Sequence, residues 1–137
     1  MIKIEHVYGD YFISDNKELL KLDTICAFLS RSYWANQRSV ETIVKSINHS
    51  NTYGVYHGEK QIGYARVVTD WATVYYLCDV FIDEDYRGTG VGKKLIQLIT
   101  EEYEGIFGLL GTLDAHGFYE QYGFQHNAER FMVRRPS

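Results

Sequence analysis

Proline and cysteine are scarce in this chain of 137 residues, which contains one proline and two cysteines. Cys26 and Cys78 lie 52 positions apart in apolar surroundings, and the chain has no C-x-x-C pair. This spacing argues against a disulfide scaffold and predicts two reduced thiols in a cytoplasmic protein. The five histidines show no paired ligand spacing, so we expect no metal site.

Long apolar runs and an excess of positive charge are also missing. No apolar run approaches the roughly 18 residues of a membrane-spanning helix, and we expect no signal peptide at the N-terminus. The net charge is −4, whereas a general nucleic-acid-binding protein usually has a basic face. We therefore expect neither a membrane nor a nucleic acid as a partner. A mildly acidic surface is compatible with a cationic substrate and also with simple solubility.

Aromatic residues, in contrast, are plentiful, since 12 tyrosines, 7 phenylalanines and 2 tryptophans make up 15% of the chain. The apolar fraction of 45% and the charged fraction of 23% are ordinary for a globular protein. The length fits a single domain over residues 1–137, and such a domain buries roughly two-thirds of the surface of its unfolded chain.

Apolar periodicity predicts alternating helices and strands. Helices are expected at 21–32, 40–47, 91–103 and 115–122, the second with Ser39 as its N-cap. Strands are expected at 10–14, 52–57, 61–69, 72–82, 106–113 and 131–134, with a hairpin turn at 58–60. The resulting order, β-α-α-β-β-β-α-β-α-β, predicts a mixed α/β fold around one sheet, because antiparallel hairpins are followed by a βαβ crossover.

The most informative motif is a glycine-rich loop between the predicted strand 72–82 and the predicted helix 91–103. Gly88, Gly90 and Gly92 would let several backbone N–H groups approach an anion at a helix N-terminus. A Walker A loop does not fit, because Arg87 stands where its first glycine belongs and Lys94 replaces its Ser or Thr. A dinucleotide fingerprint needs G-x-G-x-x-G, whereas this run is G-x-G-x-G. The pattern [RQ]-x-x-G-x-[GA] does fit.

Two stretches carry a family resemblance. The first runs from Asp79-Val-Phe-Ile82 through Arg87-Gly-Thr-Gly-Val-Gly92, and the second is His116-Gly-Phe-Tyr-Glu-Gln-Tyr-Gly-Phe124. With both stretches in this order, the sequence resembles the GNAT superfamily of N-acetyltransferases over nearly its whole length. The resemblance implies the GNAT-like acyl-CoA N-acyltransferase fold, with acetyl-CoA as cosubstrate and no metal.

The resemblance also implies which residues hold the cofactor. In such proteins the strand before the loop splays away from its neighbour, so main-chain groups of Val80, Phe81 and Ile82 would bind the pantetheine arm. Backbone N–H groups of the loop would bind the pyrophosphate; these belong to Arg87, Gly88, Thr89, Gly90, Val91 and Gly92. Lys93 would add charge in the first helical turn, or it would belong with Lys94 to a solvated helix face.

Acetyl transfer to an amine requires a neutral amine, a stabilised thioester oxygen and protonation of the departing thiolate. The resemblance assigns Tyr119 as the acid, with Tyr122 as the rival; the alternative for Tyr119 is a packed aromatic. A backbone N–H near Val80 would polarise the carbonyl.

The general base is open at this point. Asp79 lies in an otherwise apolar strand, so it is expected either to act as a base or amine anchor, or to be tied to the backbone or to Arg66 across the sheet. We expect Asp114 to cap the short helix that follows it. His116 would relay a proton or simply start that helix, and water would serve if no residue does.

We expect the acceptor to enter beside the first two helices, where Tyr33, Trp34 and Arg38 would line a pocket or simply cover the sheet. The predicted function is direct transfer of an acetyl group from acetyl-CoA to a primary amine in a ternary complex, because no activated nucleophile is evident. A small-molecule amine is the expected partner. The alternatives are a non-catalytic acyl-CoA-binding module and a protein lysine or N-terminal acetyltransferase. A homodimer through the C-terminal strand edge is a further expectation.

Overall fold

A single sheet organises the protein, whose computed structural model describes residues 2–136. Six strands lie in the order β1-β2-β3-β4-β5-β6. Neighbouring strands are antiparallel except β5 and β6, which are parallel. The strands are β1 (Glu5–Tyr8), β2 (Tyr11–Ser14), β3 (Asn51–His57), β4 (Lys60–Thr69), β5 (Val74–Ile82) and β6 (Phe107–Leu109). The predicted mixed α/β class is confirmed.

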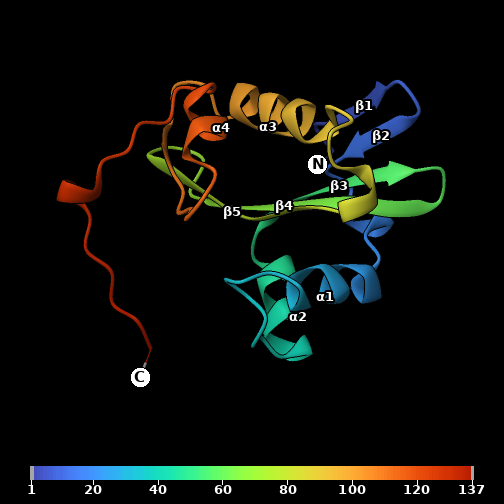
Figure 1. Ribbon diagram of the computed structural model, residues 1–137, viewed down its shortest axis with the longest axis horizontal. Helices are drawn as coiled ribbons and strands as arrows, with labels where there is room; N and C mark the ends of the chain where they lie inside the picture. The colour runs from blue at the N-terminus through green and yellow to red at the C-terminus, as the bar shows by residue number, and fades with distance from the viewer. Residues whose placement is uncertain (1, 137) are drawn as a thin grey trace.

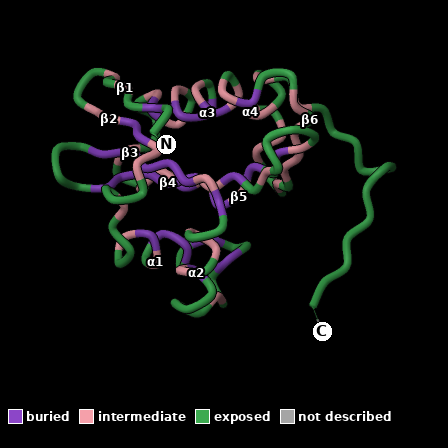
Figure 2. Tube along the Cα trace, turned by 180° about the vertical axis from the view of Figure 1, so that it is seen from behind, coloured by how far each residue is buried: buried purple, intermediate pink, exposed green. Residues whose placement is uncertain are grey.

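Helices cover both faces of the sheet (Figure 1). Helices α1 (Leu22–Ser30) and α2 (Val40–Asn48) lie on one face, and α3 (Val91–Glu102) and α4 (His116–Glu120) lie on the other. The buried residues form two clusters, one between the sheet and α3 and one between the sheet and α1 and α2. Figure 2 shows these buried segments in purple along the strands and the inner sides of the helices.

Local sequence signals explain where several elements begin and end. The Ser39 hydroxyl accepts a hydrogen bond from the Thr42 amide, so the predicted N-cap of α2 is confirmed. His57 pairs with Lys60 in the β3–β4 hairpin, which leaves a tight turn that contains Gly58 at φ 61°. A left-handed backbone at this position favours glycine, as the predicted turn requires.

The N-terminal strand 10–14 is confirmed as β2, whereas its hairpin partner β1, whose exposed residues carry little apolar signal, was not predicted. Three expectations about the C-terminal part were wrong. The strand 106–113 is reduced to the three residues of β6. The strand 131–134 is not formed, because this segment pairs with no strand and leaves the body as an exposed tail (Figures 1 and 2). Asp114 does not cap α4; the N-cap is Ala115, whose amide donates to the Thr112 hydroxyl.

The tail bears on the predicted homodimer. Met132 is 98% exposed and Val133 is 78% exposed, so the apolar side chains of this segment are not covered by the chain itself. The predicted homodimer required a C-terminal strand, which this segment does not form. The homodimer itself stays a prediction.

Candidate functional site

The sheet opens between β5 and β6. The parallel pairing joins Val74 to Phe107, Tyr75 to Gly108 and Tyr76 to Leu109, and it ends there. Strand β5 continues to Ile82, so residues 77–82 have a neighbouring strand on the β4 side alone. Backbone groups along this free edge are therefore available to a ligand that lies in the slot, and Val80, Phe81 and Ile82 belong to it.

A β-bulge shapes the middle of this edge. Between the pairs Arg66–Cys78 and Tyr64–Phe81, strand β5 contains one residue more than β4. Asp79 takes up the extra residue with φ 54°, which is rare for a residue other than glycine. The bulge directs the Asp79 side chain toward α1 and α2, and the residue beside it, Val80, packs with the cluster on the α3 side.

The glycine loop follows β5 directly and ends at the N-terminus of α3. Gly88 and Gly90 have φ of 83° and 86°, which favours glycine at both positions. A Cβ on Gly90 would also lie 2.9 Å from the Tyr8 hydroxyl. The Arg87 Nε donates to the Ile82 carbonyl at 2.9 Å, so the loop is tied back to the end of β5.

Several amides of this loop are available to an anion. Within residues 2–136, the amides of five loop and first-turn residues donate to no protein acceptor. They belong to Gly88, Thr89, Gly90, Gly92 and Lys93. The positive end of the α3 dipole lies at the same point, and the Lys93 side chain is exposed beside it. This arrangement of donors fits a pyrophosphate group, which supplies several negative oxygens within a few ångströms.

Tyr119 stands on α4 and packs against the same buried cluster as Val80 and Ile82. Burial raises the pKa of its hydroxyl to about 12, and neighbouring Tyr33 and Asp114 add to the rise. The Tyr122 hydroxyl is engaged elsewhere, since it donates to the Lys93 carbonyl at 3.0 Å. Of the two predicted acid candidates, the geometry therefore favours Tyr119.

Asp79 is held by three donors on the α1–α2 side of the sheet. Trp34 Nε1 donates to Oδ1 at 3.0 Å, and Arg38 Nη1 and Arg66 Nε donate to Oδ2 at 2.7 and 2.8 Å. The carboxylate is only 1% exposed. Of the two open alternatives for Asp79, this geometry favours the tie to Arg66.

The loop between α1 and α2 reaches across the end of the slot. The Tyr33 hydroxyl accepts a hydrogen bond from the Leu113 amide at 3.0 Å, which joins this loop to the segment after β6. The Tyr33 and Trp34 rings meet edge to face, with centroids 5.0 Å apart. The sequence predicted that both residues either line an acceptor pocket or cover the sheet. It did not predict the bond to Leu113, which joins residues 80 positions apart and gives no local signal.

A profile described as Acetyltransferase (GNAT) domain matches residues 48–126, more than half of the chain, and includes β5, the glycine loop, α3 and α4. The chain belongs to the GNAT family. GNAT proteins use acetyl-CoA as their cosubstrate, and the free amides described above fit its pyrophosphate group.

Known relatives agree with this membership. The chain is 30% identical over 114 residues to GCN5-related N-acetyltransferase 2 of Arabidopsis thaliana, a match that covers 77% of this chain and 43% of the relative. It is 28% identical over 117 residues to protein FG08082 of Gibberella zeae, which is named as an acetyltransferase. This match covers 71% of this chain and 66% of the relative. The chain thus spans less than two-thirds of the length of both relatives.

Solved structures share the fold. A GNAT-family crystal structure from Xanthomonas campestris pv. campestris is 31% identical, has a TM-score of 0.88, and the match covers 95% of this chain and 96% of that one. The ribosomal-protein-S18-alanine N-acetyltransferase of Escherichia coli, at 18% identity and a TM-score of 0.67, covers 86% of this chain and 79% of its own, and shows the fold alone.

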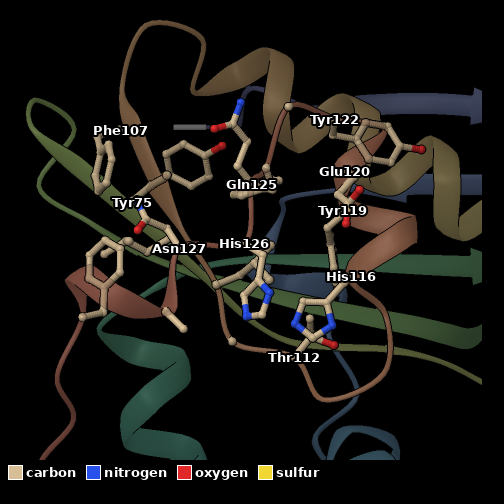
Figure 3. Close-up of a pocket in the computed structure, with 18 of the residues that line it drawn as sticks. Tyr75, Phe107, Thr112, His116, Tyr119, Glu120, Tyr122, Gln125, His126 and Asn127 are labelled. Carbon is tan, nitrogen blue, oxygen red and sulfur yellow. The ribbon is translucent and has the colours of Figure 1, made fainter.

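A cavity of about 620 Å³ adjoins the GNAT site at Tyr119 (Figure 3). It lies between β6, α4 and the segment up to Phe131, and the His116 and His126 rings meet in it with centroids 4.7 Å apart. None of residues 77–92 lines it. The free edge of β5 and the glycine loop therefore belong to a different part of the surface from this cavity.

Residues 2–136 contain no group of three or more His, Cys, Asp or Glu side chains that could hold a metal ion. Their helices are too short or too polar to span a membrane. Cys26 and Cys78 are both free thiols, as predicted. Burial raises the pKa of the Cys78 thiol to about 11, so it is not a thiolate near neutral pH.

Proposed function

We propose that this GNAT protein transfers an acetyl group from acetyl-CoA to a primary amine. The observation that carries the proposal is a path from the free amides at the N-terminus of α3 to the unpaired edge of β5, with Tyr119 packed on the buried cluster that Val80 and Ile82 also contact. The path offers an anion site, backbone partners for an amide-containing arm, and a proton donor at the reacting end.

Each part of the path has a role in binding. The loop amides and the α3 dipole bind the pyrophosphate, and Lys93 adds a charge that salt screens. Backbone groups of Val80, Phe81 and Ile82 bind the pantetheine arm by adding to the edge of β5. Bound acetyl-CoA supplies a thioester carbon for the amine to attack. The bulge leaves a backbone group near Val80 outside the regular pairing, where it polarises the thioester oxygen.

Tyr119 stabilises the departing sulfur. Its pKa of about 12 keeps the hydroxyl protonated across the physiological range. A model thiol has a pKa of about 8.5, so complete proton transfer to a thiolate is uphill by several pKa units. The hydroxyl therefore acts by donating a hydrogen bond to the sulfur as negative charge develops there.

The protonation state of Cys78, the thiol nearest the bulge, supports direct transfer in a ternary complex. With a pKa of about 11, only about one Cys78 in 10⁴ is a thiolate at pH 7, too few for an acyl-enzyme route. Asp79 is hydrogen-bonded to three donors and buried, so we assign the removal of the amine proton to water.

Thiol release tests this proposal. The protein, acetyl-CoA and a panel of small amines are mixed, and free CoA is followed with a thiol reagent, with amine-free mixtures as the baseline. Amine-dependent release supports the transferase. If calorimetry shows acetyl-CoA binding but neither small amines nor peptides cause CoA release, the protein is a binding module. If peptides alone cause CoA release, it is a protein acetyltransferase.

A further inference from the structure

The face of the sheet that α1 and α2 cover carries a cluster of charged side chains that we call the Arg38–Asp79–Arg66 cluster. It begins at the bulge in β5 and includes Arg38 from the loop that joins α1 and α2. Arg66 also donates from Nη1 to the Ser50 hydroxyl at 3.0 Å. The cluster thus connects β4, β5 and the segments on both sides of α2, next to the slot that would hold the thioester.

The cluster carries a charge surplus. Two guanidinium groups face one carboxylate, so the cluster has a net charge of +1 in a chain whose net charge is −4. Arg38 and Arg66 both pair with Asp79, and within residues 2–136 neither guanidinium has a second carboxylate within 4.0 Å. A buried surplus of charge is costly unless an anion or water compensates it.

The surplus charge can be reached from solvent through Arg38. The Arg38 side chain is 28% exposed, whereas Arg66 is 12% and Asp79 is 1% exposed. Arg38 uses one hydrogen bond of its guanidinium on Asp79, and an arginine has five N–H donors. Trp34, at 39% exposure, and Tyr76, at 44%, leave apolar and hydroxyl surface beside it. A planar guanidinium with free N–H groups fits a carboxylate in two parallel hydrogen bonds.

We propose that the acceptor is a small amine that also bears a carboxylate, and that Arg38 binds this carboxylate. The inference rests on the proposed transferase function and narrows its substrate class. Asp79 then serves as the anchor that holds Arg38 and Arg66 in place, because its bonds to both fix the positions of the two guanidinium groups.

Matched acceptors test this inference. Thiol release is measured with pairs of amines that differ in a single group, namely amino acids and their carboxamides. We expect the wild-type kcat/KM for acids to exceed that for the amides at least about 10-fold, the size of an interaction between charged partners. In Arg38→Gln this ratio should fall to near 1, mainly because KM for the acids rises. Lys45→Gln removes a charge from the exposed surface of α2 and should keep the wild-type ratio.

The outcomes separate the two proposals. Equal turnover of acids and amides by the wild type, or an unchanged ratio in Arg38→Gln, overturns the carboxylate inference and leaves the transferase intact. If no amine of any kind causes release of CoA, the proposed transferase function is overturned, and the carboxylate inference is overturned with it. Arg38→Lys, which keeps the charge and loses the fork of donors, should recover part of the acid preference. Thermal unfolding of each variant shows whether it is folded.

Discussion

At the bulge in β5, the two faces of the strand offer different kinds of polar groups to a ligand. On the proposed cofactor side, the groups available to a ligand are backbone amides exposed by glycines and by a missing neighbour strand. On the proposed acceptor side, they are side chains brought together from positions 13 to 45 residues apart. The first side can bind one constant ligand whatever its neighbouring side chains are, whereas the second can change its ligand with a single substitution.

Replacing the Asp79 carboxylate, which binds Arg38 and Arg66, should cause the largest loss of stability. Asp79→Asn leaves two guanidinium groups facing a neutral amide, and breaking a buried pair costs about 3–5 kcal/mol of unfolding free energy. Urea denaturation measures this loss. As a control, Glu84→Gln breaks a solvent-exposed pair with Arg31 and should cost much less unfolding free energy than Asp79→Asn. A loss below 1 kcal/mol for Asp79→Asn would show that the cluster does not stabilise this face.

Removal of the Tyr119 hydroxyl should be the next largest effect, and it acts on turnover. Tyr119→Phe is expected to lower kcat about 100-fold, the lower range for loss of a catalytic proton or hydrogen-bond donor. The affinity for acetyl-CoA, measured by calorimetry, should stay nearly unchanged because the cradle is backbone. A larger loss of kcat in Tyr122→Phe would move the role to Tyr122.

The role of the glycine loop in binding acetyl-CoA can be tested by substituting Gly90, with Gly105 as the control position. Gly90→Ala places a side chain at φ 86° and 2.9 Å from the Tyr8 hydroxyl, so it should cost about 1–2 kcal/mol and weaken acetyl-CoA binding about 10-fold. Gly105→Ala imposes the same φ of 86° after α3 with no heavy atom within 4 Å of the new Cβ, so it should lose stability but keep affinity. Equal affinity loss in both variants would mean that strain, and not the cradle, weakens binding.

The smallest expected effect concerns the bond that joins the two sides. Tyr33→Phe removes the acceptor of the Leu113 amide, an exposed hydrogen bond worth about 0.5–1.5 kcal/mol. We expect KM for the amine to rise a few-fold with kcat and acetyl-CoA affinity nearly constant. A fall in kcat as large as that of Tyr119→Phe would instead place Tyr33 at the reacting atoms.

Sequence reasoning succeeded where local pattern determines structure. The glycine loop, the N-cap Ser39 and the strand that ends at Ile82 all follow from residues within a few positions of one another. The bulge at Asp79 could not be read in this way, because it depends on how β5 pairs with β4. The Trp34 and Arg38 contacts with Asp79 join positions more than 40 residues apart, and only the folded chain brings them together.

The C-terminal part was predicted least well for a related reason. Phe131, Met132 and Val133 form a short apolar run without alternation, so the sequence cannot distinguish a buried strand from an uncovered tail. Strand β6 was predicted too long because the run 106–113 is apolar throughout most of its length, whereas its pairing with β5 ends at Leu109.

The brevity of β6 has a dynamic consequence. Three residue pairs attach β6 to the rest of the sheet, whereas β4 is paired with neighbours along most of its length. Few backbone hydrogen bonds mean a low free energy of local opening, so amides of Phe107–Leu109 should exchange with solvent deuterium sooner than those of β4. A ligand in the slot would bridge β5 and β6 and slow that exchange. The exchange rate of the β6 amides would therefore report whether the cofactor is bound.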